Sequence, residues 1–146
     1  MGIVECKLRE YLNKHRGTVA WRVSKHCEVL EKHLNPDEEV LFVFVGQKNP
    51  EFYSLFTTCA IAITNKRMMI AQKRVVWGYF FKSITADLFN DLSVYQGLIW
   101  GSVEIDTVKE KVILTNLSKS GLADIETNIT ENMMKNKKAM QENNLW

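Results

Sequence analysis

Apolar residues in the first quarter of the chain recur at intervals of three and four. One such stripe runs through residues 3–15 and stops at Gly17. A second stripe runs through residues 19–34 and stops at Asn35-Pro36, because the residue before a proline disfavours helical backbone angles. The pattern predicts two amphipathic helices, which we call the helical preface (residues 1–34).

From residue 40 the spacing changes to that of strands. Residues 40–46 form a continuous β-branched and aromatic run, and residues 57–64 alternate large with small apolar side chains before a polar break at residues 64–67. The predicted strands cover residues 40–46, 57–64, 67–72, 75–81, 92–96, 100–106 or 101–106, and 111–115. Residues 83–91 form a mixed polar connection. Seven short strands with short connections predict an antiparallel meander and not a series of βαβ units.

The strand at residues 75–81 is unusually aromatic, and we expect it to contribute Trp77 or Phe80 to the core. Gly78 within it predicts a bulge or a sharp bend.

Helical spacing returns at residues 118–142. Its apolar residues share one helical face, and Ser118 or Ser120 is available as the N-terminal cap. The predicted fold is therefore α+β, with a helical segment at residues 1–34 followed by one domain at residues 35–146. That domain holds strands over about residues 40–116 and a C-terminal helix over about residues 118–142.

Composition and charge narrow the protein's class. The 146 residues are 46% hydrophobic and 25% charged, as in an ordinary globular domain with one core. The three cysteines include no close pair, which disfavours a disulfide or zinc framework and favours a reducing cytoplasm. The longest apolar runs fall well short of the roughly 20 residues that span a membrane, so any membrane contact would be peripheral.

Three segments carry a resemblance to a known family. They are residues 35–41 (NPDEEVL), residues 63–68 (ITNKRM) and residues 97–105 (GLIWGSVEI). In this order they resemble bacterial pleckstrin-homology (PH)-like domains of the YokE-like kind, over about residues 35–135. The resemblance implies a seven-stranded antiparallel barrel or sandwich with a C-terminal capping helix, and no family-wide catalytic activity. Eukaryotic relatives bind phosphoinositides through basic residues around the first hairpin. Here only Lys48 lies in that loop, so the lipid function is not carried over.

Basic and aromatic residues cluster around the third and fourth predicted strands. The candidate binding surface consists of Lys66, Arg67, Lys73, Arg74, Trp77, Tyr79 and Lys82. The alternative is an ordinary solvated sheet face. For Arg67 we favour a structural role, in which its guanidinium binds turn carbonyls or a carboxylate such as Asp87 and holds a barrel corner.

The sequence lacks the patterns of common catalytic and metal sites. His26 and His33 would share a helix face, but they lack the convergent ligands that a metal needs. Cys59 falls on the inward side of a strand, where cysteine acts as a small apolar residue. No phosphate-binding loop, zinc helix or nucleophile elbow is present. We therefore expect no enzyme activity, no cofactor and no bound metal.

These observations favour a non-catalytic interaction module of a bacterial or bacteriophage protein that binds a protein partner. The alternative is a cytoplasmic protein that binds peripherally to anionic lipid at the inner face of the membrane, through the basic and aromatic surface. A small enzyme, which would need a hidden pocket with perturbed carboxylates, is third, and nucleic-acid binding is not expected. The helical preface must cover its apolar stripes on the barrel or on another subunit, and we favour a homo-oligomer.

Overall fold

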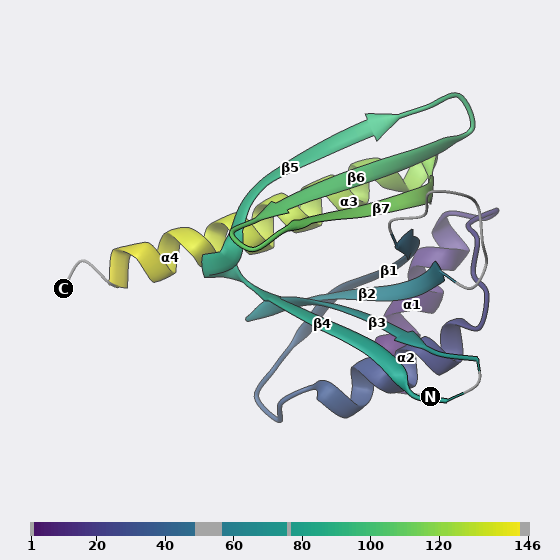
Figure 1. The fold of residues 1–146 in the computed structure, drawn as a ribbon, viewed down its shortest axis with the longest axis horizontal. Coiled ribbons are helices and arrows are strands. Elements are labelled where there is room, and N and C mark those ends of the chain that lie inside the picture. The colour runs from purple at the N-terminus through teal and green to yellow at the C-terminus, as the bar shows by residue number, and fades with distance from the viewer. Residues whose placement is uncertain (1, 49–56, 76, 144–146) are drawn as a thin grey trace.

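The computed structural model describes residues 2–48, 57–75 and 77–143 (Figure 1). Seven strands in this part of the chain form one antiparallel sheet in the order β4-β3-β2-β1-β7-β6-β5, which confirms the predicted PH-like meander. The strands are β1 Val40–Lys48, β2 Thr58–Thr64, β3 Arg67–Lys73, β4 Tyr79–Thr85, β5 Phe89–Gln96, β6 Trp100–Thr107 and β7 Lys111–Ser118. The helices are α1 Ile3–Lys14, α2 Val23–His33, α3 Leu122–Ile129 and α4 Lys135–Asn143, with short turns of helix at Ala86–Leu88, Lys119–Gly121 and Thr130–Met134.

The sheet folds sharply between β1 and β7. β1 pairs with β2 along almost its whole length, whereas it meets β7 only where Gln47 and Lys48 face Thr115 and Leu114. The sheet is consequently divided into two walls, β1–β4 and β5–β7, which face each other as a half-barrel (Figure 1). The two edge strands, β4 and β5, do not pair with each other, so the half-barrel stays open on this side.

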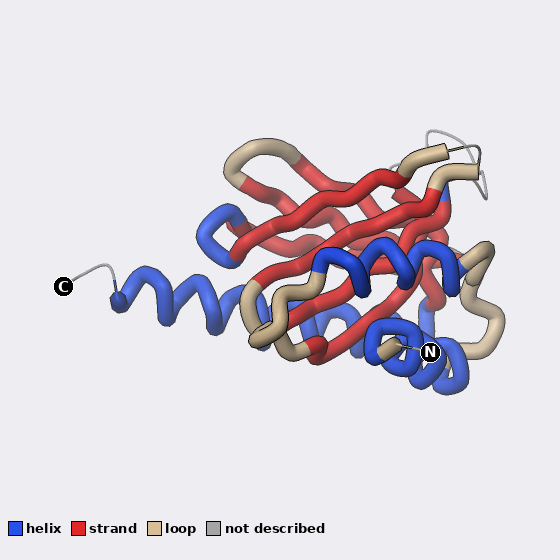
Figure 2. The backbone as a smooth tube through the Cα atoms, turned by 90° about the horizontal axis from the view of Figure 1, so that it is seen from below, coloured by secondary structure: helices blue, strands red, loops and turns tan. Residues whose placement is uncertain are grey.

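The helical preface packs against its own chain. α1 covers β1, and α2 covers β2 and β3, which Figure 2 shows as a helix lying across the strands. Leu8 and Leu30 are fully buried in a core shared with the sheet. The apolar stripes therefore pack on the barrel of their own chain, so they give no reason to expect a homo-oligomer. All seven residues of β2 are buried because both faces of this strand are covered.

The start of α2 differs from the prediction. The helix begins at Val23 and not near Val19, because Arg22 adopts a left-handed backbone conformation with φ of 55°. A non-glycine residue in this region interrupts helical hydrogen bonding, so the apolar spacing of residues 19–22 belongs to a connecting segment.

The C-terminal helix closes one side of the half-barrel. Leu122, Ile125, Ile129 and Met133 bury its inner face, and the helix continues through a π turn into α4, which extends beyond the sheet (Figure 1). The predicted serine cap is wrong. α3 starts after Gly121 without a side-chain cap, since the hydroxyl of Ser120 bonds His15 and Ser118 instead.

The predicted boundaries of the fourth and fifth strands need correction. Trp77 lies in the turn before β4. A hydrogen bond from the Arg74 amide to the Gly78 carbonyl closes this turn, and Gly78 adopts φ of 76°. Of Trp77 and Phe80, which we expected as alternative core residues, Phe80 is the one that packs against the core. The segment expected to be a polar connection instead continues β4 and begins β5, because its buried residues Ile84 and Phe89 face the core.

Candidate functional site

The residues predicted as one binding surface occupy three separate places. Lys66 and Arg67 lie at the β2–β3 turn, and Lys73 and Arg74 lie at the other end of β3. A strand of seven residues spans about 20 Å, at roughly 3.3 Å per residue. Lys82 lies on the face of β4 opposite to Tyr79, because side chains on a strand alternate and the two residues are an odd number of positions apart.

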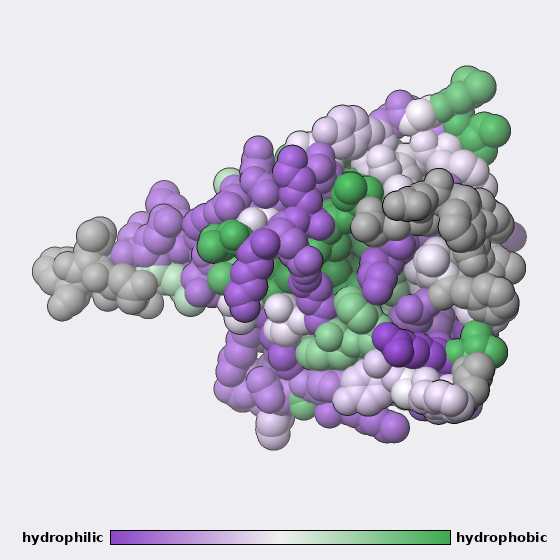
Figure 3. Space-filling model, viewed as in Figure 1, coloured by the Kyte–Doolittle hydropathy of each residue, from purple (hydrophilic) through white to green (hydrophobic). Residues whose placement is uncertain are grey.

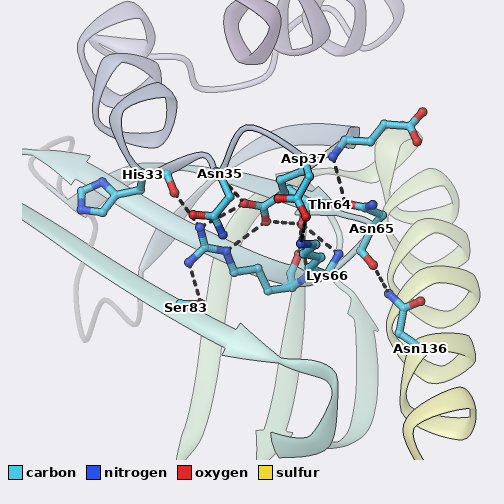
Figure 4. A network of polar contacts seen from close by, with 11 residues as sticks. His33, Asn35, Asp37, Thr64, Asn65, Lys66, Ser83 and Asn136 are labelled. Atoms are coloured by element: carbon cyan, nitrogen blue, oxygen red, sulfur yellow. Dashed lines mark hydrogen bonds and ion pairs between the residues drawn. The ribbon is translucent and has the colours of Figure 1, made fainter. Parts of the chain in front are cut away.

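Figure 4 shows a polar network at the β2–β3 turn, around the labelled residues His33, Thr64 and Ser83. Arg67 makes most of its contacts. Its guanidinium donates to both carboxylate oxygens of Glu38, at 3.0 and 3.1 Å, to the His33 carbonyl at 2.6 Å and to the Ser83 hydroxyl at 3.3 Å. The side chain of Glu38 is fully buried. Burial alone would raise the pKa of Glu38, but hydrogen bonds from Arg67 and Thr64 lower it, so the carboxylate stays ionised.

The structural role predicted for Arg67 is therefore present, but the suggested partner is wrong. Asp87 accepts a hydrogen bond from the Thr85 hydroxyl instead. The network continues through an ion pair between Lys66 and Asp37 at 2.5 Å and a bond from Asn136 of α4 to the Asn65 carbonyl at 3.1 Å. Both basic residues of this turn are thus engaged within the chain.

Lys73, Arg74, Trp77 and Tyr79 do lie together, at the β3–β4 turn. Trp77 is 79% exposed, while Tyr79 meets the ring of His33 edge-on at 5.4 Å between centroids. A shallow groove beside them is lined by Glu28, Val29, Lys32, His33, Lys73 and Tyr79. Of the predicted surface, these four residues form the largest group that lies at a single turn.

A second exposed apolar turn escaped the sequence analysis. In the β5–β6 turn Leu98 is 92% exposed and Ile99 is 67% exposed, and Trp100 is partly exposed behind them. Lys119 donates a hydrogen bond to the Leu98 carbonyl at 3.0 Å. The available signal was an apolar triplet between Gly97 and Gly101, at a position where a turn normally carries polar residues.

Both apolar turns lie at one end of the molecule, on the right in Figure 1. Figure 3 shows hydrophobic surface at the upper and lower corners of this end. We call it the tip end and define it by Lys73, Arg74, Val75, Trp77, Tyr79, Leu98, Ile99 and Trp100. Two hairpins that are distant in sequence thus place large exposed apolar side chains at the same end of the molecule.

Charge is divided between the two ends of the half-barrel. The described connecting segments at the tip end are residues 15–22, 74–75, 77–78, 97–99 and 119–121, and they hold four Arg or Lys and no Asp or Glu. The segments at the opposite end are residues 34–39, 65–66, 86–88 and 108–110, and they hold five Asp or Glu and two Lys. The tip end therefore combines positive charge with exposed apolar side chains.

His15 joins the end of α1 to the start of α3. Its buried ring bonds the Ser120 hydroxyl through Nδ1 at 2.9 Å and the Asp124 carboxylate through Nε2 at 2.8 Å. Lys14 also pairs with Asp124 at 2.9 Å. Hydrogen bonds from Lys14 and His15 lower the pKa of Asp124. The sequence analysis missed this contact, because its partners are more than 100 residues apart.

The remaining histidines and the buried Cys59 occupy structural positions. His26 Nδ1 accepts the Lys73 amide at 2.8 Å, and the His33 ring stacks on Phe81 at 3.8 Å. Burial raises the pKa of the Cys59 thiol to about 12, so this thiol is not a ready nucleophile. Across residues 2–48, 57–75 and 77–143, no group of three His, Cys, Asp or Glu residues is placed to hold a metal ion.

Comparisons with known proteins agree with this architecture. Solved structures of other proteins share the fold. A pleckstrin-homology domain from Shewanella amazonensis SB2B has a TM-score of 0.53 at 13% identity, covering 77% of this chain and 88% of that one. A DUF1696-family protein with a pleckstrin-homology domain from Shewanella loihica PV-4 has a TM-score of 0.50 at 15% identity, covering 80% and 93%. The hSac2 domain of the human phosphoinositide phosphatase Sac2 has a TM-score of 0.53 at 10% identity, covering 81% and 82%.

Sequence comparison assigns the family. No curated protein matches the chain significantly. In the described part of the chain, no helix has both the length and the apolar character needed to cross a membrane. The family model described as "Bacterial PH domain" matches residues 34–136, which is well over half of the chain. The chain therefore belongs to the bacterial PH domain family, whose fold generally serves as a non-catalytic binding module.

Proposed function

We propose that the protein is a binding module that attaches peripherally to anionic membrane surfaces through its tip end. The observation that carries this proposal is the pair of apolar turns, with Trp77 79% exposed on one and Leu98 92% exposed on the other, directed to the same end of the molecule. Burying one such side chain fully gains about 1.5–3 kcal/mol, so two turns together would contribute several kcal/mol on insertion.

The surrounding charge favours an anionic surface. Arg16, Arg22, Arg74 and Lys119 lie in the connecting segments at this end, and Lys73 ends the adjoining strand. Each Lys or Arg near an anionic bilayer contributes about 1 kcal/mol, and this attraction falls as salt increases. Tryptophan and tyrosine prefer the interface between headgroups and acyl chains, which suits Trp77, Tyr79 and Trp100.

The shape of the tip end favours a membrane over the protein partner that the sequence first suggested. A standard protein interface buries about 800 Å² on each partner as one contiguous patch. Here the exposed apolar residues lie at the apices of two separate turns. A fluid bilayer can accept two separate points of insertion, whereas a rigid protein partner would need two matching pockets. Binding to a protein partner stays a prediction.

Liposome flotation tests the proposal. The full chain should float with vesicles that contain phosphatidylglycerol and not with pure phosphatidylcholine, and it should detach as salt increases. The double variant W77S/L98S and the variant R74E should lose most of the flotation. Val108 and Lys109, on exposed positions of the β6–β7 turn at the opposite end, provide the matched controls V108S and K109E.

Three results would contradict the proposal. They are equal flotation on neutral and anionic vesicles, full flotation by W77S/L98S, and an equal loss in V108S. Circular dichroism of each variant would show that the substitutions leave the fold intact.

A further inference from the structure

The open side of the half-barrel contains a small cleft that the membrane proposal does not use. It lies between the wall formed by β3 and β4 and the beginning of β7, and its volume is about 230 Å³. The lining residues are Lys48, Ile70, Phe80, Lys82, Glu110, Lys111, Val112 and Ile113. Figure 3 shows hydrophobic surface surrounded by polar groups in the middle of this face. The cleft therefore combines apolar walls with lysines.

Lys48 is the unusual residue of the cleft. Its ammonium group lies 3.5 Å from the centroid of the Phe80 ring, and no carboxylate of the described residues is in ion-pair range of it. Burial lowers the pKa of Lys48, because a partly buried ammonium group loses part of its hydration. A partly desolvated cation that no carboxylate of the described residues neutralises is unfavourable, and an anion placed beside it would reduce that cost.

The other charges of the cleft do not neutralise Lys48. Lys82 is paired with Glu110, and Lys111 lies 3.6 Å from Glu104. Burial lowers the pKa of Lys82, and the positive charge of Lys48 lowers it further. Because Lys82 and Lys111 each have a carboxylate partner, Lys48 leaves the described residues of the cleft with a net charge close to +1.

We propose that this cleft binds a small amphipathic anion, namely a short-chain carboxylate. The carboxylate would face Lys48 and Lys82, and the alkyl chain would contact Ile70, Phe80 and the β7 edge at Val112 and Ile113. At about 30 Å³ for each water-sized group, the volume holds roughly eight heavy atoms, which is the size of hexanoate. Acetate would leave the apolar walls uncovered, and phosphate would bring a second charge without any apolar contact.

Isothermal titration of the full chain with hexanoate tests this inference. Hexanoate should saturate one site. Acetate, 1-hexanol, hexylamine and inorganic phosphate should bind at least about tenfold more weakly, because each lacks the tail or the negative charge. K48Q should weaken hexanoate binding by a similar factor, and K82Q should also weaken it. K25Q, an exposed lysine on α2, should leave the binding unchanged.

Several outcomes would overturn the inference. They are no saturable hexanoate binding, equal binding of 1-hexanol or phosphate, and unchanged affinity in K48Q that retains the wild-type melting temperature. The membrane proposal fails or holds separately, because W77S/L98S changes the tip end and should bind hexanoate like the wild type.

Discussion

Glu38 and Arg67 form a two-pronged ion pair across 29 residues of sequence, with the carboxylate fully buried. Glu38 belongs to the NPDEEVL segment and Arg67 to the ITNKRM segment, two of the three segments that resemble bacterial PH-like domains. The pair fixes the start of β1 and the end of α2 against the β2–β3 turn, since Arg67 also bonds the His33 carbonyl. The ion pair therefore joins these two segments to each other in the folded protein.

Breaking this pair should destabilise the protein strongly. In R67M the buried carboxylate of Glu38 loses its counter-ion, and removal of one partner from a buried pair typically costs about 3–5 kcal/mol. Urea denaturation should show this loss. The matched control is K66M, which breaks the exposed pair with Asp37 and should cost less than about 1 kcal/mol. Equal losses in the two variants would mean that Arg67 contributes no more than a surface charge.

The free energy of unfolding should decrease as pH falls from about 6.5 to 4, because of His26. Burial is the main cause that lowers the pKa of His26 in the folded protein to about 4, whereas an unfolded histidine titrates near about 6.5. The unfolded state therefore takes up a proton first, and the stability present above pH 6.5 is lost as pH falls through this window.

The full loss should approach about 3 kcal/mol. Protonation would also remove the acceptor of the Lys73 amide. Urea denaturation at several pH values in this window, for the wild type and H26Q, measures the effect. Parallel pH profiles would show that His26 is not responsible.

The two aromatic residues proposed for the core should differ in their effect on stability. Trp77 is exposed in the turn, so W77A should change the free energy of unfolding by less than about 0.5 kcal/mol. Phe80 packs against the core, and F80A should cost about 2 kcal/mol or more. Thermal unfolding of both variants decides this. Full stability in both would contradict the position of β4.

The helical preface should be required for folding of the domain. Leu8 and Leu30 are fully buried, so L8A and L30A should each cost about 2–5 kcal/mol, whereas I3A on the exposed side of α1 should have little effect. A chain that starts at Asn35 exposes the outer face of β1–β4 and should aggregate or lose cooperative unfolding. Light scattering and calorimetry would detect this. A stable, monomeric truncated chain would show that the preface is dispensable.

Local patterns of the sequence determined most of the secondary structure. Apolar spacing located both helices of the preface, the seven strands and the C-terminal helix, because the period of a helix or strand is a property of a few neighbouring residues. The same alternation placed Cys59 in the core. It failed at residues 77–78 and 83–91, where the aromatic run begins in a turn and the polar run includes strand residues that bury Ile84 and Phe89.

Tertiary structure decided which charged and apolar residues meet. Arg67 bonds Glu38 and not Asp87, and Lys82 turns into the cleft away from Tyr79, because these contacts depend on strand register and on packing of distant segments. The cleft exists because β1 and β7 pair at only two positions and the sheet folds there. The tip end likewise required the strand order, since only the order of strands brings the β3–β4 and β5–β6 turns to one end of the half-barrel.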